Sequence, residues 1–318
     1  MLARDIIKRV REIQVRTGRQ VADVLAGQYV SVFKGRGIEF DEVRPYLPGD
    51  DVRTIDWNVT ARMGEPFVKR FVEERQLTLM LMADVSASQD FGSTSRSKRE
   101  ATAELCALLA FSATRNDDKV GLSLFHGKIE KYIPARKGQK HSLRVVREVL
   151  THGLEPESPR VRRKTRWLPF GRKRSWMRTG KQATDISGAM EFLMSVSSRR
   201  TVCFVVSDFF DRDYLQALQA ANRKHDVIAV LMTDPRELEI PNVGLVHMSD
   251  PETGERIRVD TGSAAVRQSV AQAAKQRIVN LENSFRAAKI DFIHIDDPNS
   301  VVDPLAKFFR MRERRQRR

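Results

Sequence analysis

The stretch Leu77-Thr78-Leu79-Met80-Leu81-Met82-Ala83-Asp84-Val85-Ser86-Ala87-Ser88 decides the fold class of this chain. Its apolar part is too short for an isolated helix and too apolar for a half-exposed strand, which predicts a fully buried strand. A carboxylate and two hydroxyls follow directly, at Asp84, Ser86 and Ser88. Because α/β sheets bind ligands at the carboxyl ends of central strands, the stretch predicts a central strand with a site at its end.

Strands and helices alternate along the chain after residue 77, which predicts an α/β fold with a doubly wound, mostly parallel sheet. The closely spaced strands 119–126 and 129–134 predict a hairpin that adds an antiparallel edge strand. A short strand is expected at Arg256–Val259. The predicted main strands are 77–84, 119–126, 129–134, 201–208, 226–232 and 290–295. The predicted helices are 96–115, 138–151, 184–198, 213–224, 263–288 and 302–312.

Three regions follow from this pattern. Residues 1–75 are expected to form an N-terminal extension, with a helix over 1–27 and irregular, strand-like chain over 28–75. Residues 76–300 form the α/β domain, which a basic insertion interrupts at about 155–182. Residues 301–318 form a C-terminal helix and a basic tail, whose cations we expect to be a solvated helix end.

Composition limits the class of protein. The chain has 318 residues and a net charge of +15, and none of its apolar runs approaches the roughly 18 residues that span a membrane. Cys106 and Cys203 lie in apolar segments and are expected to be buried thiols, and the histidines lack zinc-ligand spacing. We therefore expect a cytoplasmic protein without a transition-metal site.

Further oxygen ligands are available for a cation near Asp84. Thr184 opens a predicted helix, and Asp208 ends the apolar strand 201–208. Together with the stretch at 84–88 they could hold a hard divalent cation, Mg²⁺ or alternatively Mn²⁺ or Ca²⁺. The alternative is that these side chains only cap helices, and Asp185 is open to either role. The predicted metal ligands are Asp84, Ser86, Ser88, Thr184 and Asp208.

In type, order and context these residues resemble the metal-ion-dependent adhesion site of von Willebrand factor A domains. The resemblance implies Mg²⁺ held by the hydroxyls directly and by the aspartates directly or through water. It also implies an open coordination position that accepts a carboxylate from an acidic protein partner. The chain departs from many adhesion domains at Phe209, where they have glycine.

A second motif, Gly35-Arg-Gly-Ile-Glu39-Phe-Asp41-Glu42-Val-Arg44-Pro-Tyr46-Leu-Pro48-Gly49-Asp50-Asp51-Val-Arg53-Thr-Ile-Asp56-Trp57-Asn-Val-Thr-Ala-Arg62, resembles the signature of a bacterial family. This is domain-of-unknown-function family fifty-eight, and with the metal motif the resemblance covers about residues 30–210. It implies a partner, a MoxR-type AAA+ ATPase, for which members are thought to act as adaptors or chaperone-like cofactors. From its dense mixed charges, we expect most of this signature block to pack the extension onto the α/β domain, with a few exposed residues contacting a partner.

The basic charge is concentrated in two segments. Arg160–Lys181 contains ten lysines and arginines and no acid, and Lys307–Arg318 contains seven against Glu313 alone. Cations mixed with aromatic residues suit an anionic membrane surface, a protein partner or, ranked last, a nucleic acid. A solvated loop without a ligand is the competing interpretation. The candidate partner-binding residues are Arg166, Trp167, Arg172, Arg174 and Trp176.

The leading hypothesis is a non-enzymatic, divalent-metal-dependent protein-interaction module coupled to an AAA+ ATPase. The first alternative is a Mg²⁺-dependent phosphoryl-transfer enzyme with Asp84 as nucleophile. It lacks a general acid, because Ser86 stands where Asp-x-Asp phosphatases have their second carboxylate. The second alternative is a nucleic-acid or membrane-surface binder acting through the basic insertion.

Overall fold

The structure, a computed structural model, describes Glu12, Tyr29 and residues 37–74, 77–152, 184–249 and 256–316. The predicted helix over 1–27, apart from Glu12, and the basic insertion at about 155–182 lie outside the described residues.

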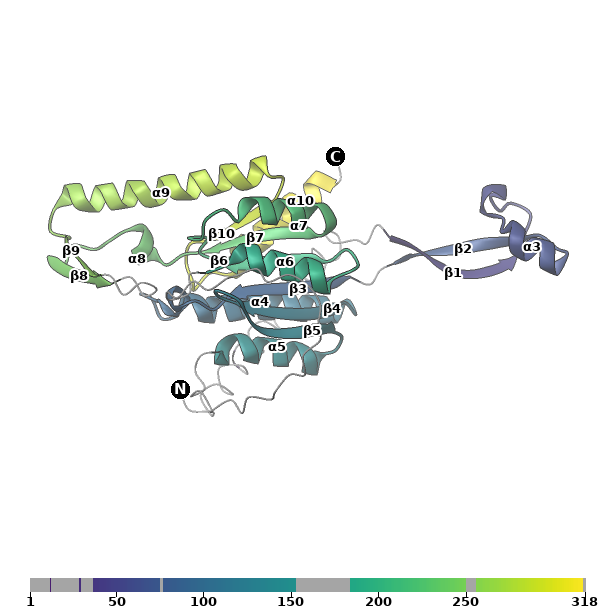
Figure 1. Ribbon diagram of the computed structural model, residues 1–318, viewed down its shortest axis with the longest axis horizontal. Helices are drawn as coiled ribbons and strands as arrows, with labels where there is room; N and C mark the ends of the chain where they lie inside the picture. Colours follow the sequence, from purple (N-terminus) through teal and green to yellow (C-terminus); the bar gives the residue numbers. More distant parts are fainter. Residues whose placement is uncertain are drawn as a thin grey trace, which may run out of the picture.

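A six-stranded sheet with the strand order β10-β7-β6-β3-β4-β5 forms the centre of the molecule (Figure 1). Neighbouring strands are parallel except β4 and β5, which are antiparallel. Counted along the chain, this is the 3-2-1-4-5-6 order of doubly wound α/β proteins, so the predicted fold class and its antiparallel edge are confirmed. The strands are β3 (Thr78–Asp84), β4 (Lys119–Phe125), β5 (Ile129–Arg136), β6 (Val202–Ser207), β7 (Asp226–Met232) and β10 (Asp291–Ile295).

Helices cover both faces of the sheet and bury two separate hydrophobic cores. Successive residues of β3 alternate between them: Leu79 and Leu81 pack in the core beneath α4, α5 and α10, while Met80 and Met82 pack beneath α6, α7 and α9. This alternation explains why the strand is apolar on both faces. The helices are α4 (Lys98–Arg115), α5 (Gln139–Thr151), α6 (Ile186–Val196), α7 (Leu215–Lys224), α9 (Ala264–Ala287) and α10 (Val302–Gln316).

The C-terminal helix α10 belongs to the α/β core. Leu305 and Phe309 are fully buried, and Arg312 forms ion pairs with Asp226 and with Asp291, the latter at 3.2 Å. The expectation of a solvated helix end is therefore wrong for Arg312, because the carboxylates that begin β7 and β10 lie next to this turn of the helix.

The signature block and the strand that follows it form an arm, residues 37–74, that projects away from the α/β domain (Figure 1). Its stem is an antiparallel pair, β1 (Gly37–Pro45) and β2 (Phe67–Glu74), and its end carries a short 3-10 helix (Val52–Thr54) and α3 (Trp57–Met63). The expectation that most of the block packs onto the α/β domain is wrong. Its charged groups pair within the arm instead, as in the ion pairs Arg44–Asp50 at 2.7 Å, Lys69–Asp56 at 3.4 Å and Arg70–Glu42 at 3.2 Å.

A second projection lies between β7 and α9. It consists of α8 (Pro235–Leu238) and an antiparallel pair, β8 (Leu245–Ser249) and β9 (Arg256–Asp260), which confirms the short strand expected near Arg256. Among the residues that the structure describes, no helix is long and apolar enough to span a bilayer.

The sheet order places the switch point of the fold between β3 and β6. These two neighbours lie at the centre, and from them the chain continues outward in opposite directions, through β4 on one side and β7 on the other. In doubly wound sheets such a switch point is where ligands bind, at the carboxyl ends of the strands. Asp84 ends β3 and Asp208 directly follows β6, so both aspartates lie at this switch point.

Candidate functional site

Asp84 is anchored by the loop that follows its own strand and by the neighbouring strand. Its Oδ1 accepts a hydrogen bond from the backbone nitrogen of Ser86 at 2.8 Å, and its Oδ2 accepts one from Ser207 Oγ at 2.7 Å. The side chain is only 3% exposed. Burial raises the pKa of the Asp84 carboxyl and the charge of Asp208 raises it further, whereas the hydrogen bonds from Ser207 and Ser86 lower it.

A chain of hydroxyl groups connects the loop after β3 to Asp208. The Oγ atoms of Ser86 and Ser88 are 2.9 Å apart, and Ser88 Oγ donates to Asp208 Oδ2 at 2.7 Å. Ser86 is the N-cap residue of a short 3-10 helix, η3 (Ala87–Asp90), and Ser88 lies within it. The structure therefore brings together Asp84, Ser86, Ser88 and Asp208, and their role as metal ligands stays a prediction.

Thr184 lies at the same edge of the sheet, immediately before α6. The next residue donates its backbone N–H to the carbonyl of His126 at 2.9 Å, and Val85 donates to the adjacent carbonyl, of Phe125, also at 2.9 Å. The segment that carries Thr184 and the loop after Asp84 are thus held by successive carbonyls at the end of β4. Thr184 is 7% exposed, and its Oγ1 is buried without a hydrogen-bond partner among the described residues.

Asp185 has a structural role in this arrangement. It is the N-cap residue of α6, and its Oδ1 accepts the Gly188 backbone N–H at 2.7 Å. Asp211 assists by accepting the Ile186 N–H at 2.9 Å. Of the two roles left open for Asp185, the structure shows the helix-capping one.

The donor set fits a hard divalent cation. It combines two buried carboxylates of like charge, hydroxyl groups of two serines, and a buried threonine hydroxyl that lacks a partner. A divalent cation would balance the carboxylates and give Thr184 Oγ1 an interaction, and Mg²⁺ prefers such oxygen ligands. Within the described ranges, no group of three or more histidine, cysteine, aspartate or glutamate side chains could hold a metal ion, so a cation at this place would need the hydroxyl groups as ligands.

Three residues that contact the site were not predicted. Ser207 binds Asp84, Lys98 Nζ lies 3.4 Å from Asp208 Oδ2, and Arg277 donates to the backbone carbonyl of Asp208. Arg277 comes from α9, more than sixty residues further along the chain, and no local pattern indicates it. Lys98 carries a weak signal, because a cation in the first turn of a helix opposes the helix dipole and needs a specific partner.

Phe209 takes an unusual backbone conformation beside the site. Its φ is 54°, in the left-handed region that bulky residues rarely adopt. The ring is 3% exposed and packs against Tyr214 and Phe285, with centroid distances of 5.6 and 5.2 Å. This packing holds the backbone directly after Asp208, at the position where the sequence departs from many adhesion domains.

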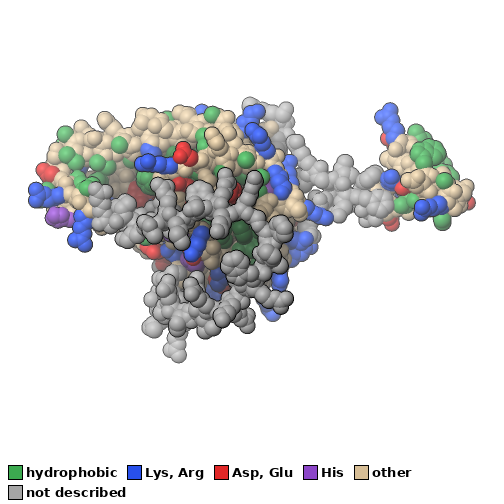
Figure 2. Space-filling view, viewed as in Figure 1, with side chains coloured by type: hydrophobic (Ala, Val, Ile, Leu, Met, Phe, Trp, Pro, Cys, Tyr) green, Lys and Arg blue, Asp and Glu red, His purple; other side chains and the backbone are tan. Residues whose placement is uncertain are grey.

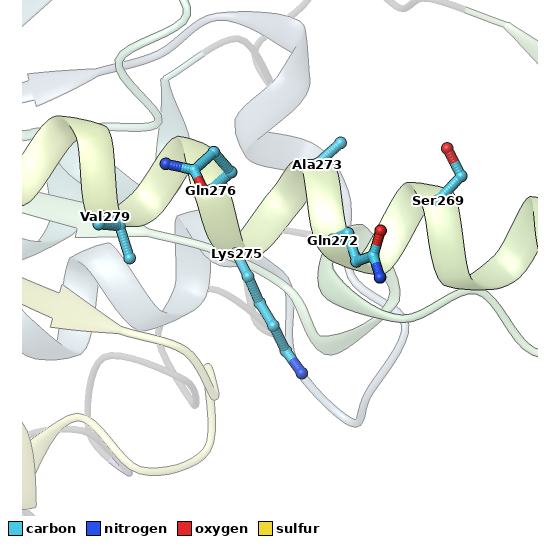
Figure 3. Close-up of a pocket in the computed structure, with 6 residues that line it drawn as sticks. All are labelled: Ser269, Gln272, Ala273, Lys275, Gln276 and Val279. Carbon is cyan, nitrogen blue, oxygen red and sulfur yellow. The ribbon is translucent and has the colours of Figure 1, made fainter.

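Two surface hollows of the described residues lie away from the site. Arg166, Trp167, Arg172, Arg174 and Trp176 lie outside the described residues. A hollow of about 560 Å³ is lined by side chains that all stand on α9, and Figure 3 shows them along a single helix. A groove of about 970 Å³ lies beside β10 and α10. Neither is lined by a residue of the site.

The strand order and the helices on both faces of the sheet define a doubly wound α/β protein. Residues 42–279 match the family described as "Protein of unknown function DUF58", and the chain belongs to this family. The match includes most of the arm as well as the site residues. Recognition of the family from the signature block and the metal motif is thereby confirmed.

Comparison with individual proteins agrees with this assignment. The chain is similar to "Uncharacterized protein Rv1480" of Mycobacterium tuberculosis (strain ATCC 25618 / H37Rv), with 28% identity over 306 residues, 96% of this chain and 89% of that protein. It is also similar to "Uncharacterized protein YeaD" of Bacillus subtilis (strain 168), with 28% identity over 117 residues, 37% of this chain and 27% of that protein.

Two solved structures share part of the architecture. The conserved hypothetical protein BatB from Bacteroides thetaiotaomicron has a TM-score of 0.44 and 17% identity, covering 75% of this chain and 99% of that chain. The SpRpn10 VWA domain has a TM-score of 0.35 and 10% identity, covering 72% of this chain and 94% of that chain. With scores this low, the fold class rests on the strand order of the chain itself.

Proposed function

We propose that the chain is a non-enzymatic, divalent-metal-dependent protein-interaction module that serves as an adaptor or chaperone-like cofactor of a MoxR-type AAA+ ATPase. The observation that carries the proposal is the buried Thr184 hydroxyl, which has no partner among the described residues, at the sheet edge where the strands before Asp84 and Asp208 end. A buried hydroxyl without a hydrogen bond is unfavourable unless a ligand contacts it, and the negative charge of the neighbouring carboxylates favours a cation as that ligand.

Mg²⁺, or alternatively Mn²⁺ or Ca²⁺, would be held by Asp84, Ser86, Ser88, Thr184 and Asp208. When bound, the cation supplies an electrophilic point that takes a carboxylate from an acidic partner. The protein's own residues keep this point preorganised, since Ser207 fixes Asp84 and Arg277 holds the backbone of Asp208. A binding role is favoured over phosphoryl transfer because Ser86 occupies the position of the second acid that such chemistry needs.

The end of the arm supports a role in protein interaction. Leu47, Val52, Trp57 and Met63 are 59%, 63%, 70% and 63% exposed, and Figure 2 shows hydrophobic side chains gathered at this end. Exposed apolar groups clustered on a projection mark an interaction surface, and tryptophan is typical of binding hot spots. We assign this arm tip (residues 47–63) to a second contact with the ATPase, in addition to the metal site, which takes an acidic side chain of the same partner.

Binding to the purified cognate ATPase tests the proposal. We expect wild-type chain to bind in Mg²⁺ and to lose binding in a chelator and in the Asp84→Asn variant. Asp118→Asn is the matched control, because Asp118 is equally buried but precedes β4 at the opposite edge of the sheet. Binding that survives both chelation and Asp84→Asn would refute the metal-dependent mechanism.

A further inference from the structure

Lys98 is a buried cation whose ammonium group contacts two carboxylates. Its side chain is fully buried, and its Nζ lies 3.4 Å from Asp208 Oδ2 and 2.7 Å from Glu237 Oε1. It is also the first residue of α4, where the helix dipole disfavours positive charge. Burial of an ammonium is costly unless carboxylates compensate it, so its presence here requires both partners.

The oxygen that faces Lys98 is the one that links Asp208 to the candidate ligands. Asp208 Oδ2 accepts from Ser88 Oγ and from Lys98 Nζ. The aspartate thus lies between a hydroxyl of the metal site on one side and a fixed positive charge on the other. A cation bound by Asp208 and this ammonium would repel each other, because both positive charges would lie beside the same carboxylate.

Glu237 connects Lys98 to a separate element of the fold. Its Oε2 accepts the backbone N–H of Asp234 at 3.0 Å, which completes a capping box at the start of α8. Asp234 in turn accepts the backbone N–H of Ser93, in the loop that follows the metal motif, at 2.7 Å. Glu237 is 28% exposed, so it has more freedom to adjust than Asp208.

We propose that Lys98 is an internal counter-ion of the metal site, which balances Asp208 when no divalent cation is bound and shifts to Glu237 when one is. The inference rests on the proposed function, since it presumes the cation. It assigns Lys98 two effects. It stabilises the metal-free protein by neutralising one of two neighbouring carboxylates, and it weakens metal binding by repulsion. Because its second partner, Glu237, completes the capping box of α8, metal occupancy would change the contacts of α8 and of the loop at Ser93.

The test is calorimetric titration of Mg²⁺ into the full chain, together with thermal unfolding of the metal-free protein. Lys98→Met keeps the length of the side chain and removes the charge. Glu237→Gln removes the second negative partner but keeps the capping box, which glutamine also forms. Lys137→Met is the control, because it removes an ion pair with Asp117 at the opposite edge of the sheet.

We expect Lys98→Met to bind Mg²⁺ roughly tenfold more tightly than the wild type, with a lower metal-free Tm than the control. We expect Glu237→Gln to bind Mg²⁺ several-fold more weakly, because the ammonium of Lys98 then pairs with Asp208 alone and repels the cation. Unchanged or weaker binding by Lys98→Met, with normal wild-type binding, would overturn the role of Lys98. If that variant does not fold, unchanged or tighter binding by Glu237→Gln overturns it. Wild-type protein that binds no divalent cation would overturn the metal site itself and this inference with it.

Discussion

Replacing Phe209 tests how the structure tolerates a bulky residue in a left-handed conformation beside Asp208. Truncation to alanine removes a ring that is 3% exposed and packs against Tyr214 and Phe285, which costs about 3–5 kcal/mol. The left-handed backbone at φ 54° remains strained in the alanine variant, by about 1–2 kcal/mol. Glycine relieves this strain, but its greater conformational freedom in the unfolded chain lowers the free energy of unfolding by about 0.4–1 kcal/mol.

We therefore expect Phe209→Gly to be more stable than Phe209→Ala by about 1 kcal/mol, although both are less stable than the wild type. Phe285 supplies the matched control, because it is buried in the same cluster but lies in the regular helix α9. There glycine should be less stable than alanine by about 1 kcal/mol.

Urea unfolding of the four variants, analysed by linear extrapolation, measures both differences. The reversal of the glycine–alanine order between positions 209 and 285 is the signature of the strained backbone. A Phe209→Gly variant that is less stable than Phe209→Ala would refute the reasoning.

Three further predictions concern the metal site, the arm and the pH dependence of stability. Mg²⁺ at one hundred times its Kd should stabilise the wild type by about 2.7 kcal/mol, or about 4 °C in Tm, and Asp84→Asn by nothing; equal shifts in a thermal scan would contradict the site. Trp57→Ser should abolish ATPase binding without lowering Tm, since the ring is 70% exposed; retained affinity in a binding assay would exclude the arm tip. Burial raises the pKa of Asp118 to about 6, so its protonated form favours the folded state and its contribution is lost as pH rises from about 4 through 6. Asp118→Asn should therefore gain stability relative to the wild type at pH 7 but not at pH 4, and urea unfolding that shows the same difference at both pH values would contradict this assignment.

The central sheet could be predicted from sequence because burial on both faces leaves an unambiguous pattern. The run at Leu79–Ala83 serves two cores, so it is apolar throughout, and the oxygen-bearing residues begin where the strand ends. The same logic located Asp208 at the end of β6. The apolar run of a parallel strand that is buried on both faces stops where the strand ends. The sequence therefore locates the carboxyl edge of the sheet, where ligands bind.

The arm could not be predicted in the same way. Its two strands form a separate two-stranded sheet, and the register shifts between Phe40 and Glu42, which breaks the alternating pattern in β1. Its dense charges suggested packing onto the domain, yet Arg44 and Asp50 form an ion pair with each other within the arm. Lys98 was missed for another reason, because its partners Asp208 and Glu237 are more than one hundred residues away in sequence.

The central claim is that Asp84, Ser86, Ser88, Thr184 and Asp208 surround one divalent cation. The most direct measurement is an anomalous difference map from a crystal of the full chain soaked in Mn²⁺. We predict a single strong peak at the carboxyl edge between β3 and β6, in contact with Thr184 Oγ1 and with the serine hydroxyls. A map without a peak at this edge, or with a peak that leaves Thr184 Oγ1 without a partner, would contradict it.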